Sequence, residues 1–386
     1  MPDSCKVTIP CFRRSCSEVG QASYLPTPIP RIERLCLSSV RVIIVNYNSA
    51  RLALECVRSV LEHSGENDRV GITVVENGST DDSKEILNAA FSGCPALESV
   101  RYVDAVRNGG FGAGCNFGIR ETLSRNERPD FWWLLNPDAL VSAGTLDALV
   151  RVMREDSRAG IVGGSLVNWR GELMTACGPD FSPLGEFLTS AQVRSLLRRY
   201  ASSIPPEHPP SERTEPGWVC GANMLIRAAA LDDISGFDED FFLYYEDADL
   251  CRGMRDAGWR VLHEPAARVV HAVGKSTQVP VAGRWPQYIF DSRCRYFSKH
   301  LGRWGLIKAD ICWIAGWAIR GVGRWWSMGR SAPQFPERFA ADLLWTDLRS
   351  LVRARKPRRP LATQRRFDGL APSGSEKRFP DRATIS

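Results

Sequence analysis

The chain has 386 residues, of which 44% are hydrophobic and 24% are charged, as is ordinary for a soluble globular protein. Its 12 cysteines are scattered and contain no Cys-x-x-Cys, which excludes a zinc ribbon and a secreted disulfide framework. We therefore expect a cytoplasmic protein with reduced thiols, long enough for one large domain or two smaller ones.

The two ends of the chain differ in composition from the rest. Residues 1–38 are rich in Ser, Pro and Arg and lack the continuous apolar stretch of a signal peptide, so we expect a poorly ordered or start-site extension. Between Leu348 and Phe367 there are eight Lys or Arg and no acid, so the net charge of +6 resides in a basic tail. Residues 347–386 are predicted to be a disordered solubilising end, or a segment that contacts an anionic membrane. The basic run lacks interleaved aromatics that could stack on bases, so no nucleic-acid partner is expected.

Ordered structure is predicted to begin near Val40. Residues 41–48 form an apolar run that ends in polar residues, as in a buried parallel strand, and residues 50–63 carry apolar side chains at helical spacing. Further strands are predicted at 71–75, near 100–103 and at 131–135, with helices after the second and third strands. The later part is less regular: 180–215 is interpreted as a variable loop or small insertion, 250–258 as a helix and 259–270 as one or two short strands.

This alternation of strands and helices predicts an α/β domain over residues 39–300, with a mainly parallel twisted sheet flanked by helices. Each predicted strand ends in polar residues, which is the edge where open α/β sheets bind ligands.

Residues 301–346 form a Trp-rich region that is predicted to be helical. Its uncharged stretch, Ile311–Ile319, has nine residues and is too short to cross about 30 Å of hydrocarbon. Trp313 and Trp317 share one helix face, and arginines follow them. Such a helix suits a membrane interface, but a helix packed on the preceding domain fits the same pattern.

The segment 236–250 holds six carboxylates interleaved with large apolar and aromatic residues. A solvated acidic face would not need the aromatics, and a buried core would not tolerate the charges unless a cation, a proton or a partner compensated them. The mixture indicates carboxylates at the wall of a binding pocket.

Two further motifs follow apolar strands. Asn136-Pro137-Asp138 places a carboxylate where hard oxygen ligands can hold a divalent cation, although an Asx turn closed by proline has the same sequence. His271 follows Val269-Val270, and from the sequence alone we interpret it as a structural residue.

Residues 107–118 contain five glycines but satisfy neither G-x-G-x-x-G nor the Walker pattern. Small residues that open a helix allow the backbone to approach a nucleotide diphosphate. Tight packing of the loop on the helix is the alternative.

Taken in order, these motifs resemble the inverting glycosyltransferases of family 2, which have the GT-A fold, and most closely the rhamnosyltransferase type. The resemblance covers roughly residues 40–300. It is carried by Val45-Asn46-Tyr47-Asn48, Glu76-Asn77-Gly78-Ser79-Thr80-Asp81, Asn108-Gly109-Gly110 with Asn116 and Gly118, Leu135-Asn136-Pro137-Asp138, Gly221-Ala222-Asn223-Met224, Gly236-Phe237-Asp238-Glu239, Tyr245-Glu246-Asp247-Ala248-Asp249-Leu250 and His271.

The resemblance implies a role for each matching residue. Asp247 matches the general base that deprotonates the acceptor hydroxyl, and Glu246 and Trp218 are expected to contact the acceptor. Asp138 and His271 match positions that hold Mg²⁺ or Mn²⁺. The remaining carboxylates of the acidic segment are expected to shape the turn and the helix start. The nucleotide-sugar donor is expected to be lined by Asn46, Tyr47, Asn48, Glu76, Asn77, Asn108, Gly110, Asn116, Asn136 and Asp138.

Two positions depart from the family pattern: Glu76 replaces the usual Asp, and the metal motif is reduced to Asn136-Pro137-Asp138. The resemblance implies transfer of L-rhamnose from a dTDP donor to a lipid-linked or polysaccharide acceptor, at the cytoplasmic face of a membrane. A UDP-sugar donor, for example of galactofuranose, is the alternative within the family. A nucleotidyltransferase, a dinucleotide oxidoreductase and a non-catalytic nucleotide-sugar binding module explain the acidic segment less well.

Overall fold

The computed structural model describes residues 38–64, 68–92, 99–271, 283–326, 336 and 338–352. The predicted N-terminal extension and most of the predicted basic tail lie outside these residues. The seven cysteines in the described ranges are all free thiols.

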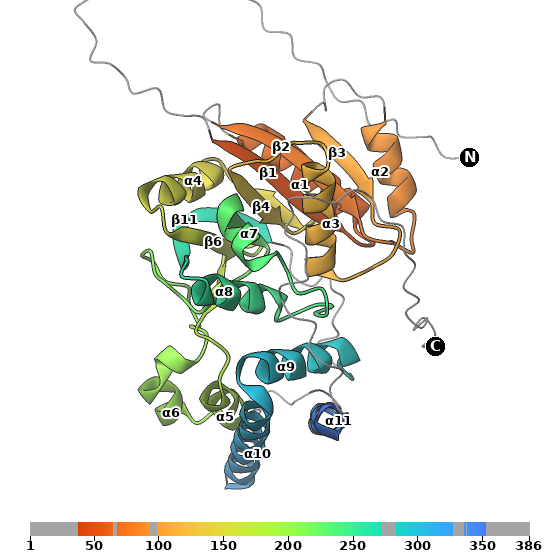
Figure 1. Ribbon diagram of the computed structural model, residues 1–386. Coiled ribbons are helices and arrows are strands. Elements are labelled where there is room, and N and C mark those ends of the chain that lie inside the picture. Colours follow the sequence, from red (N-terminus) through yellow and green to blue (C-terminus); the bar gives the residue numbers. More distant parts are fainter. Residues whose placement is uncertain are drawn as a thin grey trace, which may run out of the picture. The chain divides into compact units, whose positions relative to one another are not determined.

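A nine-stranded sheet forms the centre of the domain (Figure 1). Its main path runs in the order β3-β2-β1-β4-β10-β6-β11-β5, and β7 pairs with β6. β1 to β4 are parallel, and β11 is parallel to β6, whereas β10 runs antiparallel between β4 and β6. The strands are β1 (Ser39–Asn46), β2 (Arg69–Glu76), β3 (Val100–Asp104), β4 (Phe131–Leu135), β5 (Ala139–Val141), β6 (Ala159–Val167), β7 (Leu173–Met174), β10 (Asn223–Arg227) and β11 (Arg260–His271).

Helices cover both faces of the sheet because consecutive residues of its central strand, β1, are apolar and point alternately to the two faces. Val42 and Ile44 of β1 belong to one buried cluster, which includes side chains of α1 and α4. Ile43 and Val45 belong to the opposite cluster, which includes side chains of α3, α7 and α8. The helices are α1 (Ala50–His63), α2 (Ser83–Phe91), α3 (Phe111–Leu123), α4 (Thr145–Glu155), α7 (Ala228–Ile234) and α8 (Glu246–Asp256). This two-sided burial confirms the predicted α/β class.

The interval that was interpreted as a loop contains helical structure. It holds α5 (Pro183–Ala191), α6 (Arg194–Arg199) and a 3₁₀ turn, Ala201–Ser203, and it lies between the short paired strands β8 (Cys177–Gly178) and β9 (Trp218–Val219). Ser182 caps α5, since its hydroxyl accepts the N–H of Gly185 at 3.1 Å, and Pro183 supplies the first helical residue. Of the two predicted alternatives, the variable loop is wrong and the small insertion remains, since short helices have too few turns to show a period in the sequence.

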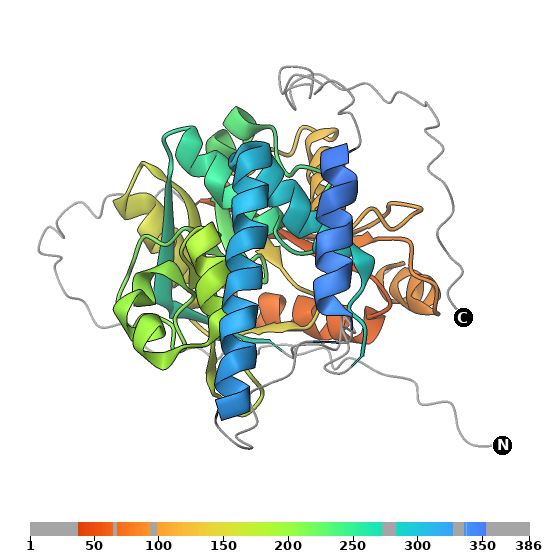
Figure 2. The same cartoon turned by 90° about the horizontal axis from the view of Figure 1, so that it is seen from below.

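The C-terminal helices are α9 (Gln287–His300), α10 (Gly302–Trp326) and α11 (Phe339–Val352). α10 packs against α5 and α9, and α11 packs against α9 (Figures 1 and 2). A β-carbon on Gly316 of α10 would lie 2.1 Å from the Ser190 hydroxyl oxygen of α5, so these two helices approach closely. The predicted alternative of a helix packed on the preceding domain is therefore present in the structure.

One buried arginine joins these helices. Arg293 of α9 forms ion pairs with Glu186 of α5 at 2.9 Å, Asp310 of α10 at 3.1 Å and Asp347 of α11 at 2.6 Å. Its side chain is only 6% exposed, so the three carboxylates compensate a charge that would otherwise be costly to bury.

Candidate active site

The last residues of β1 and β2 are joined by a hydrogen bond between their side chains. Asn46 and Glu76 are register partners, and the Asn46 amide donates to Glu76 Oε2 at 2.6 Å. Glu76 Oε1 accepts the backbone N–H of Ser79 at 2.6 Å, and the side chains of Asn46 and Glu76 are buried. The longer side chain of Glu76 thus bridges the end of β1 and the loop that follows β2.

Hydrogen bonds also join the loop after β1 to the loop that follows β2. The backbone N–H of Asn48 donates to the Ser79 hydroxyl at 3.0 Å, and Asn48 Oδ1 accepts the N–H of Thr80 at 2.8 Å. Asn48 has a φ of +51°, a left-handed conformation that asparagine tolerates well. Tyr47 is half-buried beside it.

Asn77 connects these loops to the glycine-rich loop. Its side-chain amide donates to Asn108 Oδ1 at 3.2 Å and to the carbonyl oxygen of Gly110 at 3.1 Å. Asn108 Oδ1 also accepts the N–H of Gly110 at 2.9 Å. The predicted nucleotide-lining residues Asn46, Asn48, Glu76, Asn77, Asn108 and Gly110 are therefore brought together in one hydrogen-bonded set of loops.

The glycine-rich loop packs against the acidic segment. The N–H of Phe111 donates to the carbonyl oxygen of Phe242 at 3.1 Å. A β-carbon on Gly110 would lie 2.0 Å from that oxygen, and Gly110 also has a φ of +91°. Glycine is required at residue 110 for this contact within the protein itself.

Asn116 of α3 makes its contacts with the acidic segment. Its amide donates to the carbonyl oxygen of Phe237 at 2.9 Å and to Glu239 Oε1 at 3.0 Å, and its Oδ1 accepts the N–H of Phe237 at 3.0 Å. These bonds occupy the side chain fully, so Asn116 positions the start of the acidic segment.

The candidate metal ligands lie side by side at the opposite end of the site. His271 pairs with Ala139 across β11 and β5, which places its ring beside Asp138. Its Nε2 is 3.2 Å from Asp138 Oδ1 and 3.1 Å from the Nδ2 of Asn136. The Asp138 side chain is fully buried, and His271 Nδ1 has no hydrogen-bond partner among the described residues.

This arrangement fits a divalent cation of the Mg²⁺ or Mn²⁺ type. Such ions take carboxylate and imidazole ligands from a protein and complete their shell with water and substrate phosphate oxygens. No group of three or more His, Cys, Asp or Glu is arranged for metal binding in the described part of the chain. Asp138 and His271 would therefore supply two ligands and leave the others to the diphosphate and water.

The turn before β10 links the metal end of the site to the acidic segment. The carbonyl oxygen of Ala222 accepts the N–H of Asn136 at 3.3 Å, and the backbone N–H of Gly221 hydrogen-bonds the Asp247 carboxylate. Burial, together with the charges of Asp247, Glu246 and Asp138, raises the pKa of the Cys220 thiol to about 12. The three carboxylates are thus close enough to this thiol to act on its charge.

Asp247 lies in the first turn of α8, and its carboxylate accepts the N–H of Ala248 at 2.8 Å. The helix N-terminus and these N–H groups favour the charged carboxylate. Burial outweighs them and raises the pKa of Asp247 to about 6. Such a carboxylate is ionised at neutral pH and more basic than an exposed one, as a general base requires.

Glu246 precedes Asp247 and is more deeply buried. Burial, and next the charge of Asp247, raise the pKa of Glu246 to about 8. Its Oε2 has no hydrogen-bond partner within the described ranges. Burial and the charges of the two groups therefore keep one proton on the Glu246–Asp247 pair at neutral pH, and the pair carries one negative charge.

The backbone before α8 is strained. Tyr244 and Tyr245 have φ values of +67° and +66°, which cost about 1–2 kcal/mol for each such residue. Strain of this kind persists only where surrounding contacts hold the backbone in place. The strained conformation directs Glu246 and Asp247 into the site.

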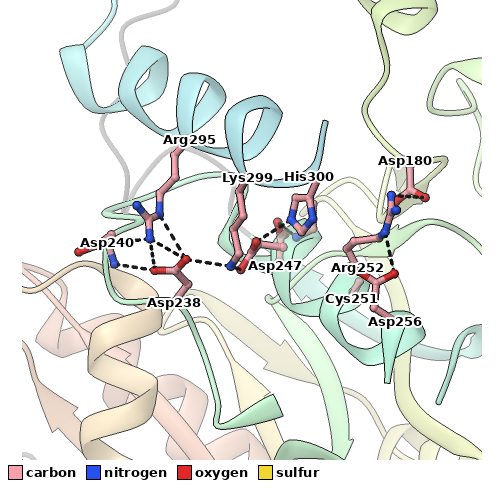
Figure 3. A network of polar contacts seen from close by, with 12 residues as sticks. Asp180, Asp238, Asp240, Asp247, Cys251, Arg252, Asp256, Arg295, Lys299 and His300 are labelled. Carbon is pink, nitrogen blue, oxygen red and sulfur yellow. Dashed lines mark hydrogen bonds and ion pairs between the residues drawn. The ribbon is translucent and has the colours of Figure 1, made fainter. Parts of the chain in front are cut away.

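Basic side chains of helix α9 form ion pairs with the acidic segment (Figure 3). Lys299 Nζ lies 2.8 Å from both Asp238 and Asp249, and His300 Nε2 is 2.7 Å from Asp249. Arg295 pairs with Asp238 at 2.7 Å and also with Asp240. These contacts hold Asp238, Asp240 and Asp249 against α9, as expected for carboxylates that shape the segment. The sequence predicted no role for Arg295, Lys299 or His300, because their partners lie about 50 residues away and leave no local pattern.

Trp218 belongs to an aromatic cluster that includes Tyr245, the residue before α8. Its ring stacks on Phe181 with centroids 5.9 Å apart, and Phe181 contacts Tyr245 at 4.5 Å and Tyr296 at 5.5 Å. The indole N–H of Trp218 is buried and has no hydrogen-bond partner in the described residues. It is a donor adjacent to the segment that carries Asp247.

Known proteins resemble this chain. The family model described as glycosyltransferase like family 2 matches residues 38–285. An N-acetylglucosaminyl-diphospho-decaprenol L-rhamnosyltransferase of Mycobacterium tuberculosis is 28% identical over 264 residues, which cover 63% of this chain and 79% of that protein. The rhamnosyltransferase WbbL of Escherichia coli is 29% identical over 176 residues, 44% of this chain and 64% of that protein.

Among solved structures, the mannosyltransferase PcManGT of Pyrobaculum calidifontis in complex with GDP-Man and Mn²⁺ is similar at 18% identity, with 86% of this chain and 84% of that chain covered and a TM-score of 0.49. The family match spans more than half of this chain, and it confirms the predicted GT-A type of α/β fold. The chain therefore belongs to glycosyltransferase family 2 and is a glycosyltransferase.

Proposed function

We propose that the protein transfers L-rhamnose from dTDP-L-rhamnose, with inversion at the anomeric carbon, to a lipid-linked or polysaccharide acceptor in cell-envelope glycan synthesis. The observation that carries this proposal is Asp247, a carboxylate of raised pKa at the start of α8, in a chain that resembles two named rhamnosyltransferases.

In the proposed reaction the acceptor hydroxyl oxygen attacks the anomeric carbon of the donor. A new C–O bond forms, the bond to the diphosphate oxygen breaks, and the nucleoside diphosphate leaves with that electron pair. Asp247 accepts the hydroxyl proton, and the N–H groups of Ala248 and Gly221 hold its carboxylate in place. A base positioned in this way contributes about 10²–10⁴-fold to the rate.

Glu246 and Trp218 are proposed to orient the acceptor. Glu246 holds its proton at neutral pH and can donate it in a hydrogen bond to an acceptor oxygen, and the Trp218 indole N–H is a second donor. Glu246 Oε2 and the Trp218 indole nitrogen are buried and have no hydrogen-bond partner in the described structure.

The donor is proposed to bind along the loops after β1, β2 and β3. Asn46, Tyr47, Asn48, Glu76, Asn77 and Asn108 would line the base and ribose, and Asn136 and Asp138 the diphosphate. Asp138 and His271 would hold Mg²⁺ or Mn²⁺, which when bound neutralises the departing diphosphate. Gly110 and Asn116 would act by holding the loops in position, since their contacts are with Phe242 and Phe237.

A UDP-sugar donor, such as UDP-galactofuranose, is the second candidate, because Glu76 can accept a hydrogen bond from either pyrimidine base. Two measurements separate the candidates. The purified protein is incubated with a panel of nucleotide sugars and a divalent metal, and released nucleoside diphosphate is measured. Thermal shifts with dTDP, UDP and GDP are compared in parallel, and dTDP is expected to stabilise most. Release of UDP alone, with UDP as the best stabiliser, would replace the rhamnosyl assignment, and no release from any donor would favour a non-catalytic nucleotide-sugar binding protein.

The site of action is proposed to be the cytoplasmic face of a membrane, with peripheral attachment. The relative from Mycobacterium tuberculosis is named for a decaprenol-linked substrate, and an acceptor of that class resides in a membrane.

A further inference from the structure

Helix α10 exposes an apolar stripe on the side that faces away from the protein. Trp304, Ile311 and Val322 are 75%, 60% and 61% exposed, and the exposed Ala315 and Ala318 complete the i, i+7, i+11, i+14, i+18 series. The stripe extends over about 27 Å of helix. The opposite face is also apolar, since Leu306, Ala309 and Trp313 are buried. A helix that is apolar on both faces requires an apolar environment on each.

Helix α11 exposes a second stripe of the same kind. Leu344, Trp345, Leu348 and Val352 follow helical spacing and are all exposed, with Trp345 at 53%. The guanidinium of Arg349 lies 4.5 Å from the centre of the Trp345 ring. Arg303 of α10 donates to the carbonyl oxygen of Leu351, which joins the two helices near one end. Figure 2 shows α10 and α11 running next to each other on the near face of the protein.

The charges of both helices are segregated. Their acids, Asp310, Asp342 and Asp347, are buried in ion pairs with Arg293 or Arg284. The exposed residues of the described parts of α10 and α11 include Arg303, Lys308 and Arg349 but no acid. The outward side is therefore apolar with a positive charge.

We propose that these two stripes, the outer face of α10 and α11, dock on an anionic lipid bilayer and lie in its interfacial plane. Tryptophan, apolar and basic side chains on one helix face are the composition of interfacial helices, and exposed apolar area of this extent marks an interaction site. No helix in the described ranges is long and apolar enough to cross a membrane. Attachment by the face of a helix is the mode that remains open to α10 and α11.

The positive charge of the two stripes favours an anionic membrane over two other binding partners, the chain's own C-terminal segment and a second copy of the protein. The chain's own C-terminal segment, with eight Lys or Arg between Leu348 and Phe367, has the same sign and would be repelled. The same face of a second copy would be repelled for the same reason. Anionic head groups are attracted by Arg303, Lys308 and Arg349 while the apolar side chains enter the acyl boundary.

Docking on a membrane would bring the active site to a lipid-linked acceptor. Only this purpose of the docking rests on the proposed function. Arg293 joins α9 to α10 and α11, and α9 also holds the acidic segment through Lys299 and His300. The docked face and the catalytic carboxylates are thus parts of one connected set of helices.

The test is co-sedimentation of the full chain with vesicles of phosphatidylcholine alone or of phosphatidylcholine mixed with phosphatidylglycerol. The variant Trp304→Ser/Ile311→Ser/Val322→Ser removes exposed side chains, so folding is preserved and is checked by thermal unfolding. The matched control is Trp169→Ser/Leu173→Ser, which removes exposed apolar side chains from the β6–β7 region. Binding to the anionic vesicles is expected to fall at least about tenfold in the α10 variant and to be unchanged in the control.

Three results would overturn the inference: no binding of the wild-type chain to anionic vesicles, equal binding by the α10 variant, or equal loss in the control. A wild-type dimer that the α10 variant converts to a monomer, without vesicle binding, would assign the face to self-association. None of these measurements uses the donor, so nucleotide-sugar turnover in solution remains a separate test of the proposed function.

Discussion

The carbonyl oxygen of Phe242 occupies the space that a β-carbon on Gly110 would need, 2.0 Å away. The loop that lines the proposed donor site and the segment that carries the proposed base are therefore in direct backbone contact. A change on one side of this contact is transmitted to the other.

Replacement of Gly110 by Ala is expected to lower both stability and turnover. The methyl group would force Phe242 away, and the φ of +91° adds strain, for a total loss of about 2–4 kcal/mol in the free energy of unfolding. The matched control is Gly144→Ala, which has a φ of +78° but nothing within 4 Å of the added carbon. Denaturant unfolding of both variants measures the difference, and equal losses would show that the Phe242 contact has no cost.

The pH dependence of turnover is expected to follow Asp247. Because its pKa is raised to about 6, kcat/KM should fall about tenfold per pH unit below pH 6, level off between pH 6 and pH 8, and fall again above pH 8 as Glu246 loses its proton. Asp247→Asn should reduce kcat by about 10²-fold or more and leave dTDP binding nearly unchanged. Asp240→Asn is the control, because Asp240 is an exposed carboxylate of the same segment. Wild-type turnover in Asp247→Asn would remove the base assignment.

Glu246 is expected to destabilise the folded protein as the pH rises. Its folded pKa of about 8 lies above the ordinary glutamate value, so between about pH 4.5 and pH 8 the folded state keeps a proton that the unfolded chain loses. This contribution to stability is therefore lost on going from pH 5 to pH 9. In Glu246→Gln the difference in unfolding free energy between these two pH values should shrink by about 1–3 kcal/mol. An unchanged difference would indicate an ordinary pKa.

The metal assignment predicts a change in cation affinity. His271→Ala should raise the Mn²⁺ concentration for half-maximal dTDP binding by about tenfold or more, and Asp138→Asn should raise it further. Calorimetric titration of dTDP at several Mn²⁺ concentrations measures this without turnover. His63→Ala, at the end of α1, serves as the control. If Mn²⁺ does not strengthen dTDP binding to the wild-type protein, these residues are not metal ligands.

Lys299 is expected to be important for stability. Its ammonium bridges Asp238 and Asp249, so Lys299→Met leaves two partly buried carboxylates without that partner and should cost about 2 kcal/mol or more. Lys84→Met removes the ion pair with Asp104 at an exposed site and should leave unfolding almost unchanged. Urea titrations of the two variants provide the comparison. Equal midpoints would mean that α9 does not hold the acidic segment.

The parallel strands β1 to β4 and the helix α1 could be predicted from the sequence. The predicted strand 131–135 and helix 50–63 coincide with β4 and α1, and the other early strands differ by only a few residues. Strands covered on both faces need continuous apolar runs, and those runs are visible without any tertiary information. The ligand edge follows from the polar residues at their ends.

The antiparallel part of the sheet and the side chains that position the site could not be predicted from the sequence. β10 lies between β4 and β6 although it follows both in the chain. β11 is one twelve-residue strand with an irregular register, where one or two short strands were predicted. Asn116 contacts Phe237 across 121 residues. A side chain that acts through so distant a partner leaves no periodicity or spacing to detect.

The ion pair between Arg293 and Asp347 predicts a genetic phenotype for the loss of helix α11. A premature stop that removed Asp347 would leave a buried guanidinium short of one counter-charge in α9, the helix that also supports the acidic segment. We therefore expect nonsense alleles in the codons for α11 to behave as loss-of-function alleles, although they spare the whole of residues 38–285 that define the family.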